Sequence, residues 1–206
     1  MANSNVKFGL KPIGVVGGVA GTTGATPYFI KSDASAMFQG SPVIATNDGT
    51  IAITGSATGD TYKHLGVFAG CEYVDATSGE KKFSNYWPGS GSADSNYDIV
   101  GFVYDNPFQR FVICTDATFT NKATARLAIF ESAAMITANA GNTTTGLSNA
   151  QLDTTTPDAA DPSFPLKVVG IQDDVENQDY TAAGLPVIVI FNNHALLDGS
   201  AEAVVS

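Results

Sequence analysis

The stretch VIATNDGTIAIT, residues 43–54, decides the fold class of this chain. Two runs rich in β-branched residues, 43–46 and 50–54, flank an Asn-Asp-Gly triplet. Asn, Asp and Gly enter left-handed backbone conformations at low cost, and β-branched residues favour strands. The stretch therefore predicts a β-hairpin.

Similar strand patterns follow along the chain. Residues 65–74 predict a longer strand, in which Gly66 and Gly70 permit a bulge or a bend. Residues 98–104 and 108–115 predict a second hairpin, because an Asp-Asn-Pro triplet between them supplies turn residues.

The last two predicted strands cover residues 166–172 and 185–192. With the others they make about ten short strands at intervals of about a dozen residues, which is typical of an all-β barrel or sandwich. We expect one such domain over residues 31–206, since no internal repeat or domain linker interrupts it.

Two segments favour helix locally. Residues 121–125 predict a helical turn, with a strand after it up to about residue 136. Residues 146–153 predict one helical turn capped by Ser148, because Ser is a favoured N-cap residue.

Residues 1–30 predict an extended N-terminal arm. Gly14–Gly24 contains many glycines, each of which costs a helix about 1 kcal/mol relative to alanine. A phosphate-binding loop is excluded there, because no Lys-Ser/Thr pair follows and no βαβ pattern surrounds it.

Charge limits the range of partners. The net charge is −10, and from Asp153 onward the chain has nine acidic residues and a single basic one, Lys167. Such an acidic chain repels nucleic acid and anionic membranes, so we expect it to bind neither. We also expect no signal peptide, because residues 1–10 are polar, and no membrane span, because the longest apolar run is residues 185–191.

Catalytic patterns are weak. The chain has two histidines, His64 and His194, and no G-x-S-x-G nucleophile elbow. Cys71 and Cys114 lie in apolar runs, where burial raises a thiol pKa and makes the thiol inert. We therefore expect buried free thiols, with a disulfide as the alternative if the two strands are neighbours, and a protein that is not an enzyme.

Metal and cofactor motifs are also weak. No C-x-x-C, H-x-x-x-H or EF-hand pattern occurs in the sequence. The acids of residues 173–179 are dense enough for weak calcium binding, although a solvated acidic loop is the simpler interpretation. We expect no metal site and no cofactor.

Aromatic residues gather in the middle third of the chain, around Tyr86-Trp87 and residues 97–111. Aromatic side chains in a row can stack on sugars, as in carbohydrate-binding modules, but core filling is their commoner use in strands. A carbohydrate-binding β module is therefore one alternative function, and an exposed Trp87 would favour it.

Several short motifs, in their order along the chain, resemble those of small structural proteins of tailed bacteriophages. These are described as capsid decoration, cement or minor capsid proteins. The likeness covers nearly the whole chain, and its clearest motifs are FGLKP at 8–12, GSPV at 40–43, LGVFAGCEY at 65–73, VYDNP at 103–107 and VIVIFNNH at 187–194.

The resemblance implies a β-barrel or β-tulip-like body that sits on the capsid surface of a virion and clamps neighbouring major capsid subunits. It also implies a homo-oligomer, most often a trimer. Proteins of this kind have no catalytic residues. A tail-tube or head-completion protein of the same virion is a second alternative and would form hexameric or dodecameric rings.

The N-terminal arm is the segment that we expect to contact the capsid. Phe8, Pro12 and Ile13 are its candidate apolar anchors, and Lys7 and Lys11 could meet an acidic neighbour. An extended arm can add main-chain hydrogen bonds along a sheet edge. On this hypothesis, deleting residues 1–30 leaves the barrel folded and abolishes shell binding.

Overall fold

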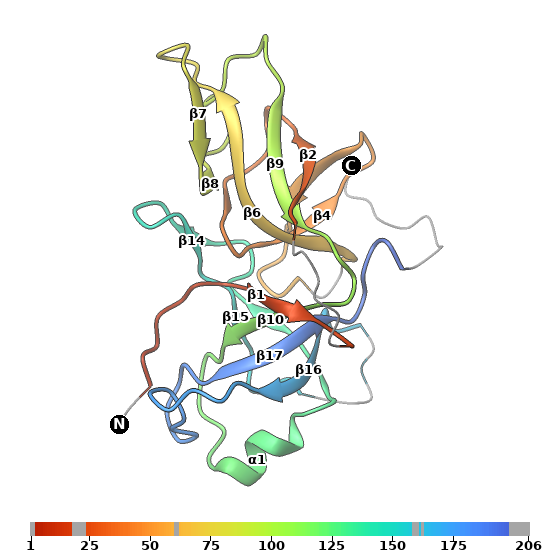
Figure 1. Cartoon of the computed structure of the whole chain (residues 1–206), viewed down its shortest axis with the longest axis vertical. Helices are drawn as coiled ribbons and strands as arrows, with labels where there is room; N and C mark the ends of the chain where they lie inside the picture. The colour runs from red at the N-terminus through yellow and green to blue at the C-terminus, as the bar shows by residue number, and fades with distance from the viewer. Residues whose placement is uncertain (1–2, 18–23, 60–61, 158–160, 162, 198–206) are drawn as a thin grey trace.

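The computed structural model describes residues 3–17, 24–59, 62–157, 161 and 163–197. These residues form a nearly all-β protein with one short helix, α1 (Lys122–Leu127). Figure 1 shows two groups of strands, one above the other, with α1 at the far end of the lower group. The expected all-β fold with a barrel is confirmed.

The upper group is a closed five-stranded barrel. Its strand order is β4–β5–β2–β9–β6, and pairing between β4 and β6 closes the ring. β7 extends the sheet beyond β6. The bounds are β2 (Thr26–Ile30), β4 (Pro42–Ala45), β5 (Thr50–Ile53), β6 (His64–Val74), β7 (Lys81–Ser84) and β9 (Ile99–Tyr104).

Apolar side chains from alternate strand positions fill the barrel. Phe68, Val43 and Val103 are completely buried there, and Trp87 packs against the same core. β6 bends at its glycines, where its pairing register shifts. A side chain at Gly70 would place its Cβ 2.8 Å from the carbonyl oxygen of Ser84, so only glycine allows the strands to approach this closely.

The lower group is an open five-stranded sheet in the order β1–β10–β17–β16–β11. All its pairings are antiparallel. One face packs on a second core, to which Phe111, Ile113 and Val189 belong, and Ala125 of α1 joins it. The bounds are β1 (Lys11–Val15), β10 (Gln109–Cys114), β11 (Ser132–Ala133), β16 (Leu166–Ile171) and β17 (Pro186–Phe191).

Three two-stranded ladders complete the fold. They pair β3 with β8, β12 with β15, and β13 with β14. Their bounds are β3 (Met37–Phe38), β8 (Tyr86–Trp87), β12 (Met135–Ile136), β13 (Gly141–Asn142), β14 (Leu147–Ser148) and β15 (Gln151–Leu152). A bridge between Gln39 and Leu147 joins the segment before β4 to β14, so the ladders tie the barrel to the rest of the chain.

Most of the expected strands are present, and the hairpin at 43–54 is confirmed by the antiparallel pairing of β4 and β5. The expected helix near 121–125 is confirmed as α1, which Asn121 caps by accepting a hydrogen bond from the backbone N–H of Thr124.

The predicted hairpin over residues 98–115 is wrong. β9 pairs with β2 and β6 in the barrel, whereas β10 pairs with β1 and β17 in the open sheet. Asp105-Asn106-Pro107 therefore carries the chain from one sheet to the other. Turn residues determine where a strand ends, but its partner is chosen by the hydrophobic face that it can bury.

The predicted helical turn over residues 146–153 is also wrong, because this segment forms β14 and β15. The Ser148 hydroxyl does accept a backbone N–H, from Ala150, but in an extended segment. Ala150 and Leu152 are buried in the second core, so tertiary burial overrides the local preference.

The free N-terminal arm is not confirmed. β1 pairs with β10, and β2 is a strand of the barrel wall between β5 and β9. Deleting residues 1–30 would therefore remove one barrel strand, and the barrel would not stay intact. Residues 18–23 of the glycine-rich stretch lie outside the described residues.

Among the described residues, the structure contains no helix that is both long and apolar enough to cross a bilayer.

Candidate binding site

The outer face of the open sheet carries an apolar strip along β17, bordered on the neighbouring strands by the basic residues Lys11, Arg110 and Lys167. An apolar strip is unusual there, because antiparallel sheets usually carry polar residues on the face turned away from the core. The sequence of β17, PVIVIF, has no polar position. Val187 and Val189 point into the core, so Pro186, Ile188 and Ile190 lie on the outer face. A strand that is apolar on both faces is typical of a sheet that is covered on both faces.

Neighbouring β10 repeats this pattern. Phe111 and Ile113 belong to the core, and the alternate residues Val112 and Cys114 line a hollow on the opposite face. Val112 is 4% exposed, whereas Ile188 and Ile190 are only half-buried. The outer face is thus covered over β10 and partly open over β17.

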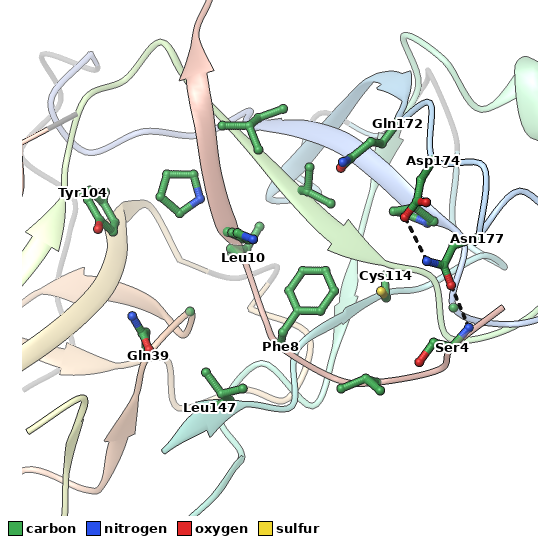
Figure 2. Close-up of a pocket in the computed structure, with 18 of the residues that line it drawn as sticks. Ser4, Phe8, Leu10, Gln39, Tyr104, Cys114, Leu147, Gln172, Asp174 and Asn177 are labelled. Carbon is green, nitrogen blue, oxygen red and sulfur yellow. Dashed lines mark hydrogen bonds between the residues drawn. The ribbon is translucent and has the colours of Figure 1, made fainter. Parts of the chain in front are cut away.

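The N-terminal segment, residues 3–10, provides part of this cover. Asn3 fixes it at one end, because its Nδ2 donates to the carbonyl oxygen of Asp179 at 2.7 Å and its Oδ1 accepts from the backbone N–H of Asp179. The backbone N–H of Leu10 donates to Gly40 O at the other end, at 2.9 Å. Between these points Phe8 projects into the hollow (Figure 2).

The hollow has a volume of about 680 Å³, a size that accommodates a small molecule or several side chains of a partner. The N-terminal segment and β1 form one wall, and β10 and Pro186 form another. Gln39, Phe68 and Tyr104 from the barrel side reach its margin. The site is therefore built where the two groups of strands meet.

One end of the hollow is polar and carries Gln172, Asp174 and Asn177 (Figure 2). The Asn177 side chain donates to Asp174 Oδ2 at 2.9 Å and accepts from the backbone N–H of Ser4 at 2.8 Å. Hydrogen bonds from Asn177 and from the backbone N–H of Glu176 lower the pKa of Asp174, so its carboxylate is charged at neutral pH. Gln172 Oε1 is buried and accepts no hydrogen bond.

The structure brings together four of the five residues predicted as capsid contacts. Phe8, Lys11, Pro12 and Ile13 all line the hollow, and Ile13 is 43% exposed. Lys7 is exposed on the same segment but does not line the hollow. Their contact with a capsid stays a prediction.

Sequence reasoning missed the residues of the sheet itself, above all Val112, Pro186 and Gln172. The uninterrupted apolar run of β17 could have indicated them, because a strand that is buried on one face needs apolar residues only at alternate positions. Gln172 carried no signal, since an unpaired buried oxygen is visible only in the folded structure.

A second apolar patch lies on the outer wall of the barrel. Phe29 is 54% exposed and stands opposite Val100, and Phe102 lies two residues further along the same face. Neither Phe29 nor its neighbours Val100 and Phe102 line the hollow. This patch is the weaker candidate.

The two histidines lie side by side at the seam between the two groups of strands. His64 pairs in parallel with His194, and its ring stacks on Phe191 with centroids 5.0 Å apart. Neither ring nitrogen of His64 has a hydrogen-bond partner. Burial, and secondarily the neighbouring His194, lower the pKa of His64 to about 3. His64 is therefore a neutral side chain of the protein interior at physiological pH.

Both cysteines are buried and free, as expected. Burial raises the pKa of Cys71 to about 12 and that of Cys114 to about 11, which keeps both thiols protonated at neutral pH. Cys114 nevertheless borders the hollow.

Trp87 is completely buried, and its Nε1 donates to the carbonyl oxygen of Ala34 at 3.2 Å. A buried indole cannot stack on a sugar, so the residue that would have favoured carbohydrate binding belongs to the barrel core. The exposed aromatics are spread over several surfaces, including Phe83 on β7 and Phe130 after α1.

The acidic loop after β16 is organised by its own hydrogen bonds. Asp174 accepts the backbone N–H of Glu176, and Asp179 accepts that of Thr181. Across the described ranges, no three His, Cys, Asp or Glu side chains are grouped so that they could hold a metal ion.

Comparison of this chain with family models, with curated proteins and with solved structures found no match.

Proposed function

We propose that this chain is a structural protein of a tailed-bacteriophage virion, which binds the assembled capsid shell and clamps neighbouring major capsid subunits. The observation that carries the proposal is the apolar strip on the outer face of the open sheet, with its hollow between Phe8, Val112 and Pro186. An apolar strip that the chain leaves partly uncovered is typical of a protein-interaction surface. The order of the short motifs along the chain supplies the identity of the partner.

Decoration works by mass action. A protein that binds only the assembled shell stabilises that shell by an amount that grows with its free concentration. Neither a catalytic group nor a cofactor is needed for this role. A homotrimer at a three-fold position of the shell is the stoichiometry that we propose.

The experiment is cosedimentation of the purified full chain with expanded capsids that lack it. We expect saturable binding at a fixed ratio of chain to major capsid protein. Ile13→Glu, at the rim of the hollow, should weaken this binding by about tenfold or more, because a buried unpaired charge is costly. Leu127→Glu is the matched control, since Leu127 is 76% exposed on α1 and lies outside the hollow.

Equal binding of both variants would reject the open sheet as the contact surface, and absence of binding by the unaltered chain would reject decoration itself. The mass of the chain in solution separates the remaining virion roles. A trimer supports decoration, whereas a ring of six or twelve copies supports the tail-tube or head-completion alternative.

A further inference from the structure

The hollow has an apolar floor and a polar end that offers hydrogen-bond acceptors. Val112, Cys114 and Pro186 form the floor, and Gln172 Oε1 and the Asp174 carboxylate belong to the polar end (Figure 2). Asn177 already uses both ends of its side-chain amide there, because its Nδ2 donates to Asp174 and its Oδ1 accepts from the backbone N–H of Ser4. The acceptor capacity left for a ligand therefore belongs to Gln172 and Asp174.

An unpaired buried acceptor is costly, and a partner that donates to it recovers the cost. Gln172 Oε1 is such an acceptor, and Asp174 two residues later adds a negative charge. Together they favour a donor that is also a cation. Among protein side chains, the ammonium of Lys and the guanidinium of Arg meet both conditions.

The shape of the apolar face indicates the rest of the ligand. Beyond the hollow an apolar strip continues along β17 over the half-buried Ile188 and Ile190, and Lys167 of β16 lies beside Ile190 at the end far from Asp174. A narrow strip of alternate apolar side chains along one strand fits a segment of polypeptide better than a compact molecule. We infer that the hollow binds an apolar segment of a partner protein chain that carries a Lys or Arg at the end facing Gln172 and Asp174.

This inference rests on the proposed function for the identity of the partner, but not for its chemistry. A second copy of this chain is a poorer occupant of the hollow, because its net charge of −10 opposes binding beside Asp174, and we expect the proposed trimer to assemble through another surface. A basic or neutral partner meets no such repulsion.

The test uses the full chain labelled with ¹⁵N and three peptides: acetyl-Lys-Gly-Val-Ile-Val-Gly-amide and the same sequence with norleucine or glutamate in first place. NMR titration measures each affinity and identifies the amides that shift. We expect the lysine peptide to bind about tenfold more tightly than the norleucine peptide, and the glutamate peptide to bind most weakly. The shifts should fall on Val112, Cys114 and Gln172.

Two variants locate the effect. Gln172→Leu keeps the size of the side chain and removes the acceptor, so it should reduce the preference for lysine over norleucine. Asp174→Asn should reduce it as well, whereas Asp173→Asn, with the same change of charge outside the hollow, should not. If the isolated Asp174→Asn chain is unfolded, Gln172→Leu alone decides the question.

Equal affinity of the three peptides, or shifts away from the hollow, would overturn the inference. So would a small molecule that copurifies with the chain in native mass spectrometry and is displaced from the hollow by the peptides, or self-association that Ile13→Glu abolishes. Because no shell is present in these titrations, their outcome is independent of whether the chain cosediments with capsids.

Discussion

The barrel and the open sheet have five strands each, but they bury their surfaces in different ways. The barrel closes on itself through β4 and β6, so side chains from its strands fill the interior together with Met37 and Trp87. The open sheet packs one face on its core and leaves the other to the N-terminal segment and a hollow of about 680 Å³. We therefore expect substitutions in the barrel core to affect mainly stability, and substitutions at the partly covered face of the open sheet to affect mainly binding.

The largest expected effect tests the closed barrel. Phe68 is completely buried, and Phe68→Ala should lower the free energy of unfolding by about 3–5 kcal/mol through lost burial and the cavity that remains. Phe83→Ala on β7 is the control, because Phe83 is 73% exposed and its removal should change the free energy by about 0.5 kcal/mol or less. Urea titration measures both. Similar losses in the two variants would mean that the barrel does not hold its core as described.

The second prediction tests the seam that joins the two regions. Burial lowers the pKa of His64 to about 3, and burial also lowers that of His194 against the opposing effect of Asp105. Both histidines take up a proton near pH 6.5 in the unfolded chain, whereas in the folded chain they do so only at lower pH. Stability is therefore complete above about pH 6.5 and falls as the pH decreases towards 3.

Between pH 7 and pH 5, His64 alone should cost about 2 kcal/mol of unfolding free energy. Denaturant titrations at several pH values measure this slope. His64→Leu should make the slope shallower over the same window, and acidic residues should not contribute until lower pH. An unchanged slope in His64→Leu would show that the seam does not exclude the protonated imidazole.

A smaller effect is expected at α1, which packs on the core of the open sheet. Asn121 Oδ1 accepts the backbone N–H of Thr124 at 2.9 Å and so caps α1, the helix that covers part of the second core. Asn121→Ala should cost about 1 kcal/mol, and Asn121→Asp, which keeps the acceptor, should cost less. Thermal unfolding followed by circular dichroism compares the two. Equal losses would indicate that the cap does not stabilise this region.

The smallest expected effect on stability separates binding from folding. Ile13 is 43% exposed on an edge strand, so Ile13→Glu should change the free energy of unfolding by about 0.5 kcal/mol or less. The same variant should lose most of its binding to shells. A large loss of stability in urea would mean that Ile13 belongs to the fold, and its effect on binding would then be indirect.

Local signals in the sequence were sufficient for most individual strands. β4 and β5 follow from their β-branched runs and the Asn-Asp-Gly turn, and the bends of β6 follow from its glycines. The buried free cysteines follow from the apolar runs around them. In each case the deciding residues lie within about ten positions of one another, where backbone preference and side-chain period act directly.

The candidate site was only partly predictable. Phe8, Lys11, Pro12 and Ile13 were selected from the sequence and do line one hollow. Their place there depends on β1 pairing with β10, a contact between residues almost a hundred positions apart. The opposite wall and the unpaired Gln172 Oε1 arise only when β10, β16 and β17 are assembled.

The sequence by itself therefore determined an all-β chain, the places of most strands and a net charge of −10. Only the tertiary structure decided which strands pair, and it placed β9 and β10 in different sheets despite the turn between them. The physical reason is that strand formation depends on local backbone and side-chain preferences, whereas pairing depends on which faces can be buried together. The hollow is the part of one such face that the chain leaves uncovered.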